Sequence, residues 1–162
     1  FTRDGVGTLL MAQSFENVRP AVIDDVGGIL RLIQPLEEEG VLVRRSRELL
    51  ENEIGHFTVI ERDGAIIACA ALYPHPGEGM GEIACVAVHP DYRRGGRADM
   101  LLQRLERQAR GLGLTRVFVH TTHTAHWFQE RAFVPAPLGA LPVARRKLYN
   151  YKRNSKVFVK EL

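Results

Sequence analysis

Hydrophobic and polar residues follow helix-like and strand-like spacings in turn along the chain, and the changes of spacing predict its secondary structure. Apolar residues at 18–23 predict a short strand. Apolar residues at helical spacing over 24–36 predict a helix that Pro35 is expected to kink or end. A second short helix is predicted over 46–54, with Ser46 as its N-cap, because a serine hydroxyl can accept a hydrogen bond from the first helical turn.

After residue 56 the spacing becomes that of strands. Apolar runs on either side of Asp63-Gly64 predict a β-hairpin, because this dipeptide is a strong turn signal. The later elements are expected to be a strand at 83–88, an amphipathic helix at 96–110, a strand at 117–119, a short helix at 126–131 and a strand at 157–159. This order predicts a mixed α/β fold, with meander strands first and a strand–helix–strand unit after them.

The chain is expected to form one domain. Residues 1–16 carry no strong periodicity and are interpreted as the remnant of a preceding domain or linker, which leaves 17–162 as the domain. Cys69 and Cys85 both lie in apolar runs and are expected to be reduced, buried thiols of a cytoplasmic protein. No apolar run approaches the length of a membrane span, and the N-terminus lacks a signal-peptide pattern, so no membrane partner is expected.

Positive charge is modest in total but clustered. The net charge is +3, and basic residues gather at 93–97 and again from Arg145 to Lys156. Clusters of this kind indicate an anionic partner, which could be a phosphate-bearing cofactor, a carboxylate substrate or a nucleic acid.

The most specific local signal is the passage from the strand ending Val86-Ala87-Val88, through Arg93-Arg94-Gly95-Gly96, into the helix that opens with Arg97-Ala98. The first turn of a helix has unpaired backbone N–H groups and a positive dipole end, and the glycines let the backbone approach a phosphate. The three arginines add charged donors. The alternative is a solvated basic loop. The segment is neither a P-loop nor a dinucleotide fingerprint, because it lacks their glycine spacing.

The turn Arg93-x-x-Gly96-x-Ala98 resembles that of the GNAT acetyltransferase superfamily, and Trp127 to Phe133 is similar to that superfamily's late helix. The resemblance implies a GNAT fold, in which a mixed central sheet flanked by helices is splayed between two parallel strands, here near 83–88 and 116–121. It also implies acetyl-CoA as co-substrate, with its pantetheine arm in the splay and its pyrophosphate on the amides of 94–98. The cofactor-binding residues implied are Cys85, Val86, Ala87, Val88, Arg93, Arg94, Gly95, Gly96, Arg97, Ala98 and Phe128.

Separated blocks between residues 42 and 156 resemble the C-terminal domain of the bacterial N-acetylglutamate synthase family. They are Leu42–Arg47, Ala68–Pro74, Gly81–Tyr92, His126–Arg131 and Leu148–Lys156. This resemblance implies L-glutamate as substrate, the first step of arginine biosynthesis, a homo-oligomer and an N-terminal amino-acid-kinase-like domain in the full-length protein. It places Arg45, Arg153 and Ser155 on the substrate carboxylates, and backbone groups around Cys85 on the amino-acid moiety.

The residue types suit this chemistry. Glutamate offers two carboxylates, each matched by the planar fork of an arginine, and an ammonium that must lose a proton before it attacks a thioester. Glu82, at the start of the central strand, is the candidate base, directly or through a water; the alternatives are a solvent-exposed carboxylate or a plain ion pair. A backbone N–H near Cys85 or Val86 could stabilise charge on the thioester oxygen. Phe128 stands where many superfamily members have a tyrosine acid, and the resemblance suggests Thr121 as the proton donor instead.

Other interpretations remain open. His120, His123 and His126 cross a strand–helix junction without a carboxylate or cysteine partner, so no metal is expected. An acetyltransferase for another amine is one alternative, and an acyl-CoA-binding sensor without turnover is another. The stretch 144–153 interleaves basic and aromatic residues, as nucleic-acid-binding modules do, but the low overall charge speaks against a nucleic-acid partner.

Overall fold

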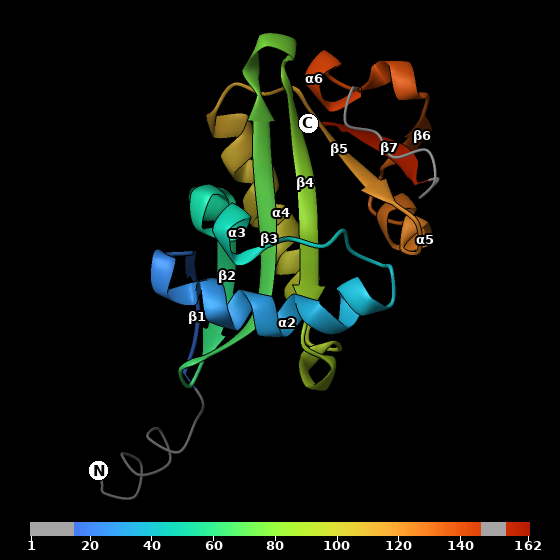
Figure 1. The fold of residues 1–162 in the computed structure, drawn as a ribbon. Helices are drawn as coiled ribbons and strands as arrows, with labels where there is room; N and C mark the ends of the chain where they lie inside the picture. The colour runs from blue at the N-terminus through green and yellow to red at the C-terminus, as the bar shows by residue number, and fades with distance from the viewer. Residues whose placement is uncertain (1–14, 147–154) are drawn as a thin grey trace, which may run out of the picture.

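A seven-stranded sheet in the order β1-β2-β3-β4-β5-β7-β6 organises the computed structural model, which describes residues 15–146 and 155–162 (Figure 1). Neighbouring strands are antiparallel except for β4 and β5, which are parallel. The strands are β1 (Glu16–Pro20), β2 (Phe57–Arg62), β3 (Ala65–His75), β4 (Met80–Val88), β5 (Arg116–Thr121), β6 (Val134–Ala136) and β7 (Lys156–Glu161).

Helices cover both faces of the sheet. In Figure 1, α2 and α3 cross the near face and α4 lies behind β3 and β4. The helices are α2 (Val26–Glu38), α3 (Arg47–Glu53), α4 (Arg97–Gly111), α5 (Ala125–Gln129) and α6 (Val143–Arg146), joined by the short 3-10 turns η1 (Ile23–Asp25), η2 (Ile54–His56), η3 (Pro76–Glu78), η4 (Pro90–Tyr92) and η5 (Leu138–Ala140). Within the described residues, none of these helices has the length and hydrophobicity that a membrane span requires.

Each face of the sheet has its own apolar core. On the α4 side the buried stripe is Leu101, Leu102, Leu105 and Ala109, packed with Ile60, Ala68 and Phe128. On the α2 side, Val26, Ile29, Ile33 and Leu50 pack against Phe57, Val59 and Cys69. Each fully buried large side chain contributes about 1.5–3 kcal/mol through the hydrophobic effect, so these stripes fix both helices on the sheet.

Local signals predicted several of these elements. The hairpin prediction is confirmed: Asp63 and Gly64 have φ of 50° and 84° and form the turn between β2 and β3. The Ser46 cap is confirmed by the bond that its Oγ accepts from the Leu49 N–H, at 3.1 Å. The first strand begins at Glu16, just upstream of the expected domain boundary, and Phe15 donates its N–H to Asp63.

α2 does not end at Pro35, so the expectation that this proline ends the helix is wrong, while a kink there stays a prediction. The helix continues to Glu38, and the Glu39 N–H still donates to the Pro35 carbonyl at 3.1 Å. Proline removes only one N–H donor, and close to the end of a helix little structure depends on that donor. The Leu36 carbonyl then accepts from the N–H groups of both Val41 and Leu42, which fixes the exit from the helix.

The parallel strands β4 and β5 are paired at one end and separated at the other. Their register joins residues 80–82 to 116–118 and stops there, although β4 continues to Val88 and β5 to Thr121. Figure 1 shows the two strands diverging beyond this point. The predicted splay is therefore confirmed, and it exposes backbone groups on both strands that an extended ligand can reach.

An irregularity in β4 lies at the start of this separation. Ala71 of β3 pairs with Ala84, but Cys69 pairs with Ala87, so β4 carries an extra residue over this stretch. Cys85 lies within it and has a φ of 56°, which is uncommon for a residue with a side chain. These features define a β-bulge at Cys85.

The bulge changes which face each side chain of β4 occupies. Ile83 packs in the core on the α4 side, whereas Cys85 packs in the core on the α2 side. In an uninterrupted strand, residues two apart point to the same face. The bulge therefore separates a first half of β4, containing Glu82, from a second half, containing Val86 to Val88.

Candidate active site

Two cavities follow one another along β4, on either side of the bulge. The first, here the Glu82 cavity, has a volume of about 490 Å³ and includes Glu82 and Ala84. The second, here the Trp127 cavity, has a volume of about 430 Å³ and includes Val86, Ala87 and Val88. Cys85 itself is buried between them.

Side chains from six regions line the Glu82 cavity. The segment before α3 and α3 itself supply Val43, Arg44, Arg45, Leu49 and Glu53; β3 supplies Tyr73 and His75; and β4 supplies Glu82 and Ala84. The last three residues are His120 of β5, Arg145 of α6 and Ser155, which directly precedes β7. The lining is strongly charged, as a site for a charged metabolite requires.

Glu82, the candidate base, is 8% exposed and faces this cavity, where an arginine holds it. The Arg145 Nε donates to the Glu82 Oε1 at 2.8 Å. Glu82 is also the last residue of β4 that pairs with β5, where it lies opposite Phe118. The structure thus places Glu82 next to the splay, as a role as the base requires. It also places Glu82 in an ion pair, which was the alternative interpretation of this residue.

Arg45 reaches the same cavity from the turn before α3. Its backbone N–H donates to the Glu37 Oε2 at 2.8 Å, and its guanidinium donates to the Val43 carbonyl at 3.1 Å. Nearby, the Tyr73 hydroxyl donates to the Glu53 Oε1 at 2.8 Å. Burial and this bond raise the pKa of Tyr73, so its phenol stays protonated across the physiological range.

Ser155 is the other predicted substrate residue that the structure brings to this cavity. It is buried, and its Oγ lies 3.3 Å from the His120 Nδ1, on the neighbouring strand β5. Arg153, also predicted to bind a carboxylate, lies outside the described residues.

The Trp127 cavity is less charged. Its lining comes from the end of α2 (Leu36, Glu39 and Val41), the end of β4 (Val86, Ala87 and Val88), the turn and start of α4 (Arg93 and Ala98), and the segment containing α5 (His123, Thr124, Trp127 and Phe128). Six of these are residues for which the sequence predicts cofactor contact: Val86, Ala87, Val88, Arg93, Ala98 and Phe128.

The turn between β4 and α4 has the backbone geometry of an anion site. Gly96 is the N-cap of α4 with a φ of 73°, so the helix begins at Arg97 after a left-handed residue. Arg93 donates its Nε to the Val88 carbonyl at 3.2 Å and stays beside the cavity, and Arg94 is exposed. The unpaired N–H groups of the first helical turn provide donors for a phosphate without any side chain.

Arg97 departs from its predicted role as a phosphate contact. Its guanidinium binds Glu16 of β1, with the Nη2 2.7 Å from the Oε1, and lies over the Tyr92 ring. This side chain therefore fixes the turn to the edge of the sheet. Only its backbone N–H belongs to the predicted anion site.

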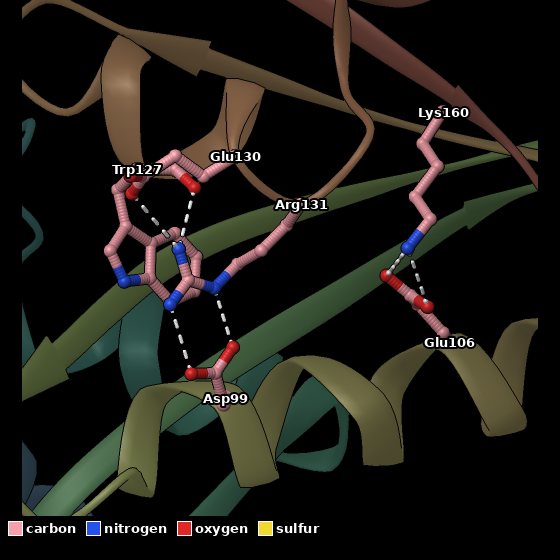
Figure 2. A network of polar contacts seen from close by, with 6 residues as sticks. All are labelled: Asp99, Glu106, Trp127, Glu130, Arg131 and Lys160. Carbon is pink, nitrogen blue, oxygen red and sulfur yellow. Dashed lines mark hydrogen bonds and ion pairs between the residues drawn. The ribbon is translucent and has the colours of Figure 1, made fainter.

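A polar network holds α5 against α4 and so positions one wall of the Trp127 cavity (Figure 2). Arg131 forms a two-pronged ion pair with Asp99, with the Nη2–Oδ2 bond at 2.9 Å, and donates to the Trp127 carbonyl at 2.8 Å. Its guanidinium stacks 3.8 Å from the centre of the Trp127 ring. Figure 2 also shows Lys160 of β7 binding Glu106 of α4.

Cys69 and Cys85 are free, buried thiols, as predicted. The Cys69 Sγ donates to the Cys85 carbonyl at 3.3 Å across the bulge. The interaction with Cys85 and burial raise the pKa of Cys69 well above its usual range.

Thr121, the predicted proton donor, ends β5 and is buried. Its hydroxyl lies 2.7 Å from the Thr124 hydroxyl and accepts the Thr124 N–H at 2.9 Å. These contacts shape the turn into α5, whose Thr124 and His123 line the Trp127 cavity. A part in proton transfer stays a prediction.

Tyr73, His75, His120 and Arg145 line the Glu82 cavity, but the sequence did not predict them as residues of this site. The basic cluster beginning at Arg145 signals an anionic ligand, yet nothing local says which of its members faces the cavity. In the described part of the chain, no three His, Cys, Asp or Glu side chains are grouped as metal ligands.

Known acetyltransferases resemble this chain in sequence. Residues 27–133 match the acetyltransferase (GNAT) family. The chain is 63% identical over 162 residues to the amino-acid acetyltransferase of Azotobacter vinelandii, and 60% identical over 162 residues to that of Serratia proteamaculans. It is covered completely in both matches but spans only 38% and 37% of those relatives.

The solved structures agree. The N-acetylglutamate synthase of Neisseria gonorrhoeae, complexed with coenzyme A and N-acetyl-glutamate, superposes with a TM-score of 0.87 at 44% identity. The match covers 93% of this chain and 36% of that one. The structure has the splayed parallel pair and the glycine-rich turn at the start of α4, and the family match covers residues 27–133. The chain therefore belongs to the GNAT acetyltransferase family.

Proposed function

We propose that this chain is an acetyltransferase domain that transfers the acetyl group of acetyl-CoA to the α-amino group of L-glutamate, the first step of arginine biosynthesis. One observation carries the proposal: a charged cavity and a cavity that ends at the glycine-rich turn before α4 lie on either side of the bulge of a splayed β4. The identity of about 60% to amino-acid acetyltransferases supports the amino-acid class of substrate.

Acetyl-CoA fits the Trp127 cavity and the gap between the parallel strands. The main-chain N–H groups of residues 94–98 would hold the pyrophosphate, with Gly95 and Gly96 allowing close approach. The pantetheine arm would add to the exposed edge of β4 at Val86 to Val88 and pass Phe128. This path brings the thioester to Cys85, at the boundary between the two cavities.

The amino acid fits the Glu82 cavity. Arg45 and Ser155 would hold its carboxylates, together with Arg153 from outside the described residues. Backbone groups at Cys85 would hold the amino-acid moiety. Three arginines in the lining favour a dicarboxylate over a polyamine, which the same charges would repel.

The reaction is a direct attack of the amine on the thioester carbonyl. Glu82 takes a proton from the substrate ammonium, directly or through a water, and the free amine then attacks. A backbone N–H near Cys85 or Val86 stabilises the charge that develops on the thioester oxygen. The attacking nitrogen loses its second proton to water as the amide forms, and the coenzyme A thiolate leaves. Thr121 is the predicted donor of the thiol proton, which it regains from water.

The test is a thiol-release assay with acetyl-CoA and a panel of L-glutamate, L-glutamine, L-aspartate and spermidine, with product identified by mass spectrometry. We expect N-acetyl-glutamate as the main product. Faster turnover of another amine would keep the acetyltransferase but change its substrate. Thiol release from no panel member, together with no coenzyme A binding in calorimetry, would reject the enzyme and favour the nucleic-acid-binding interpretation of 144–153.

The chain spans 38% of a relative's length, so further parts of the protein are proposals too. We infer an amino-acid-kinase-like domain before this one, a homo-oligomer and a cytoplasmic location, where buried thiols such as Cys69 stay reduced. Gel filtration and cell fractionation of the full-length protein test these points.

A further inference from the structure

The short helix α6 brings an arginine into the Glu82 cavity. The Arg145 side chain is 21% exposed and pairs with the Glu82 side chain, which is 10% exposed. Two contacts hold the start of the helix in place: the Val143 N–H donates to the Glu78 Oε2 at 3.1 Å, and Leu141 just before the helix is packed in a core with Phe118. Arg145 is therefore held over the cavity by the fold.

This ion pair conflicts with the proposed chemistry as it stands. A general base needs an accessible lone pair on its carboxylate at the moment when it takes a proton. A guanidinium bound to that carboxylate occupies a lone pair that the incoming proton would need. Glu82 can act as the base only if Arg145 leaves it during the reaction cycle.

The charges around the pair supply a reason for it to leave. Among the described residues, the other titratable side chains that face the cavity are Arg44, Arg45, Glu53, Tyr73, His75 and His120. Glu53 already accepts the Tyr73 hydroxyl. This part of the lining has three arginines against two carboxylates, a surplus of positive charge that a bound carboxylate neutralises.

We propose that Arg145 is a substrate-binding residue that moves its ion pair from Glu82 to a carboxylate of the amino-acid substrate. The inference rests on the proposed function of this cavity. Binding of a carboxylate substrate draws the guanidinium away, and Glu82 is then free to take the proton of the substrate ammonium. An amine without a carboxylate leaves Arg145 on Glu82 and is a poor substrate for this reason as well as for lack of anchors.

The test uses Arg145→Gln, with Arg146→Gln as matched control, because Arg146 is the next residue of α6, is exposed and lies outside the cavity lining. We expect Arg145→Gln to raise the KM for glutamate about 10- to 100-fold, as loss of a hydrogen bond between charged groups does. The kcat at saturating glutamate should change less. The control should change neither quantity.

The comparison of kcat/KM with kcat separates exchange from a static structural role. The value of kcat/KM reports the free enzyme, and that of kcat reports the substrate complex. In Arg145→Gln, exchange therefore predicts a larger loss in kcat/KM than in kcat. A fall in kcat with an unchanged KM for glutamate would overturn the proposal.

Binding of glutarate, a dicarboxylate without an amine, keeps the test independent of turnover. Calorimetry should show weaker glutarate binding to Arg145→Gln than to Arg146→Gln, even if wild-type protein acetylates no amino acid. Equal affinities would overturn the role of Arg145 while leaving the proposed function intact. If Arg145→Gln fails to fold, Arg145→Lys compared with Arg146→Lys decides: a KM increase only at position 145 supports exchange, and equal KM values refute it.

Discussion

The Glu82 cavity and the Trp127 cavity share one strand but are built from different parts of the chain. The first is lined by side chains from six regions, and the charged ones among them include the ion pair of Glu82 with Arg145. The second is lined mainly by apolar side chains and ends at a turn whose donors belong to the main chain. Substrate binding should therefore depend on single side chains, whereas cofactor binding should depend on backbone conformation.

The largest expected effect is a loss of kcat when Glu82 is replaced. Glu82→Gln removes the base, so kcat should fall about 10²- to 10⁴-fold and lose its acidic limb. Coenzyme A affinity, measured by calorimetry, should stay within about twofold, because Glu82 does not line the Trp127 cavity. Glu48→Gln, an exposed change on α3, is the matched control. An unaltered pH profile in Glu82→Gln would remove Glu82 as the base.

The next effect concerns the carboxylate anchor. Arg45→Ala should raise the KM for glutamate about 10- to 100-fold, because a buried carboxylate would lose a charged donor. Coenzyme A affinity should not change. Arg47→Ala, in the first turn of α3 and outside both cavities, serves as control in the same steady-state assay. Equal losses of glutamate and coenzyme A affinity would show that Arg45 supports the fold rather than the substrate.

A change in the turn beside the Trp127 cavity should affect the cofactor and leave the substrate unaffected. Gly96→Val places a β-branched residue at a φ of 73°, which costs about 1–3 kcal/mol of backbone strain or displaces the turn. We expect about a tenfold loss of coenzyme A affinity and an unchanged glutamate KM. Gly111→Ala, inside α4 and with open space around the added Cβ, should leave binding unchanged and slightly raise the free energy of unfolding. Normal coenzyme A binding by Gly96→Val would speak against a main-chain phosphate site.

The smallest expected effect is on the free energy of unfolding, through the Asp99–Arg131 ion pair that supports the wall of the Trp127 cavity. The hydrogen bond from Arg131 lowers the pKa of Asp99, so the ionised carboxylate stabilises the fold above the unfolded pKa of about 3.9. That contribution is lost as the pH falls through the lower folded pKa. Because Asp99 is 44% exposed, Asp99→Asn should lower the free energy of unfolding by less than about 1 kcal/mol at pH 7.

Urea unfolding at several pH values checks this expectation. The difference between wild type and Asp99→Asn should shrink toward zero as the solution becomes strongly acidic. Asp91→Asn, whose side chain is 81% exposed, should show no comparable difference at either end of the pH range. A gap between wild type and Asp99→Asn that grows on acidification would contradict the sign derived from the Arg131 contact.

The sequence predicted best where the signal is local. The turn from Val88 to Arg97, the helix after it and the Ser46 cap depend on residues next to one another, and all three are confirmed. The splay of β4 and β5 was predicted through the family resemblance. Tyr73 and Arg145 were missed because distant strands and helices bring them to Glu82.

Other features could not be predicted because tertiary contacts decide them. The positive φ of Cys85 has no local signal, since nothing but the register with β3 requires it. The Arg97 side chain has the charge for a phosphate, but Glu16 lies close enough to bind it instead. Pro35 carries a strong breaker signal, yet it sits so near the end of α2 that its lost donor matters little.

The bulge at Cys85 has a consequence for how this strand can change in length. Residues before it keep one phase of inward and outward side chains, and residues after it keep the opposite phase. Deleting Cys85 would remove the extra residue and restore regular alternation, so both halves of β4 would keep their present faces. The deletion would, however, remove the positive-φ backbone position between the candidate base Glu82 and the strand edge at Val86 to Val88. It should therefore change the backbone between the two cavities while both apolar cores stay intact.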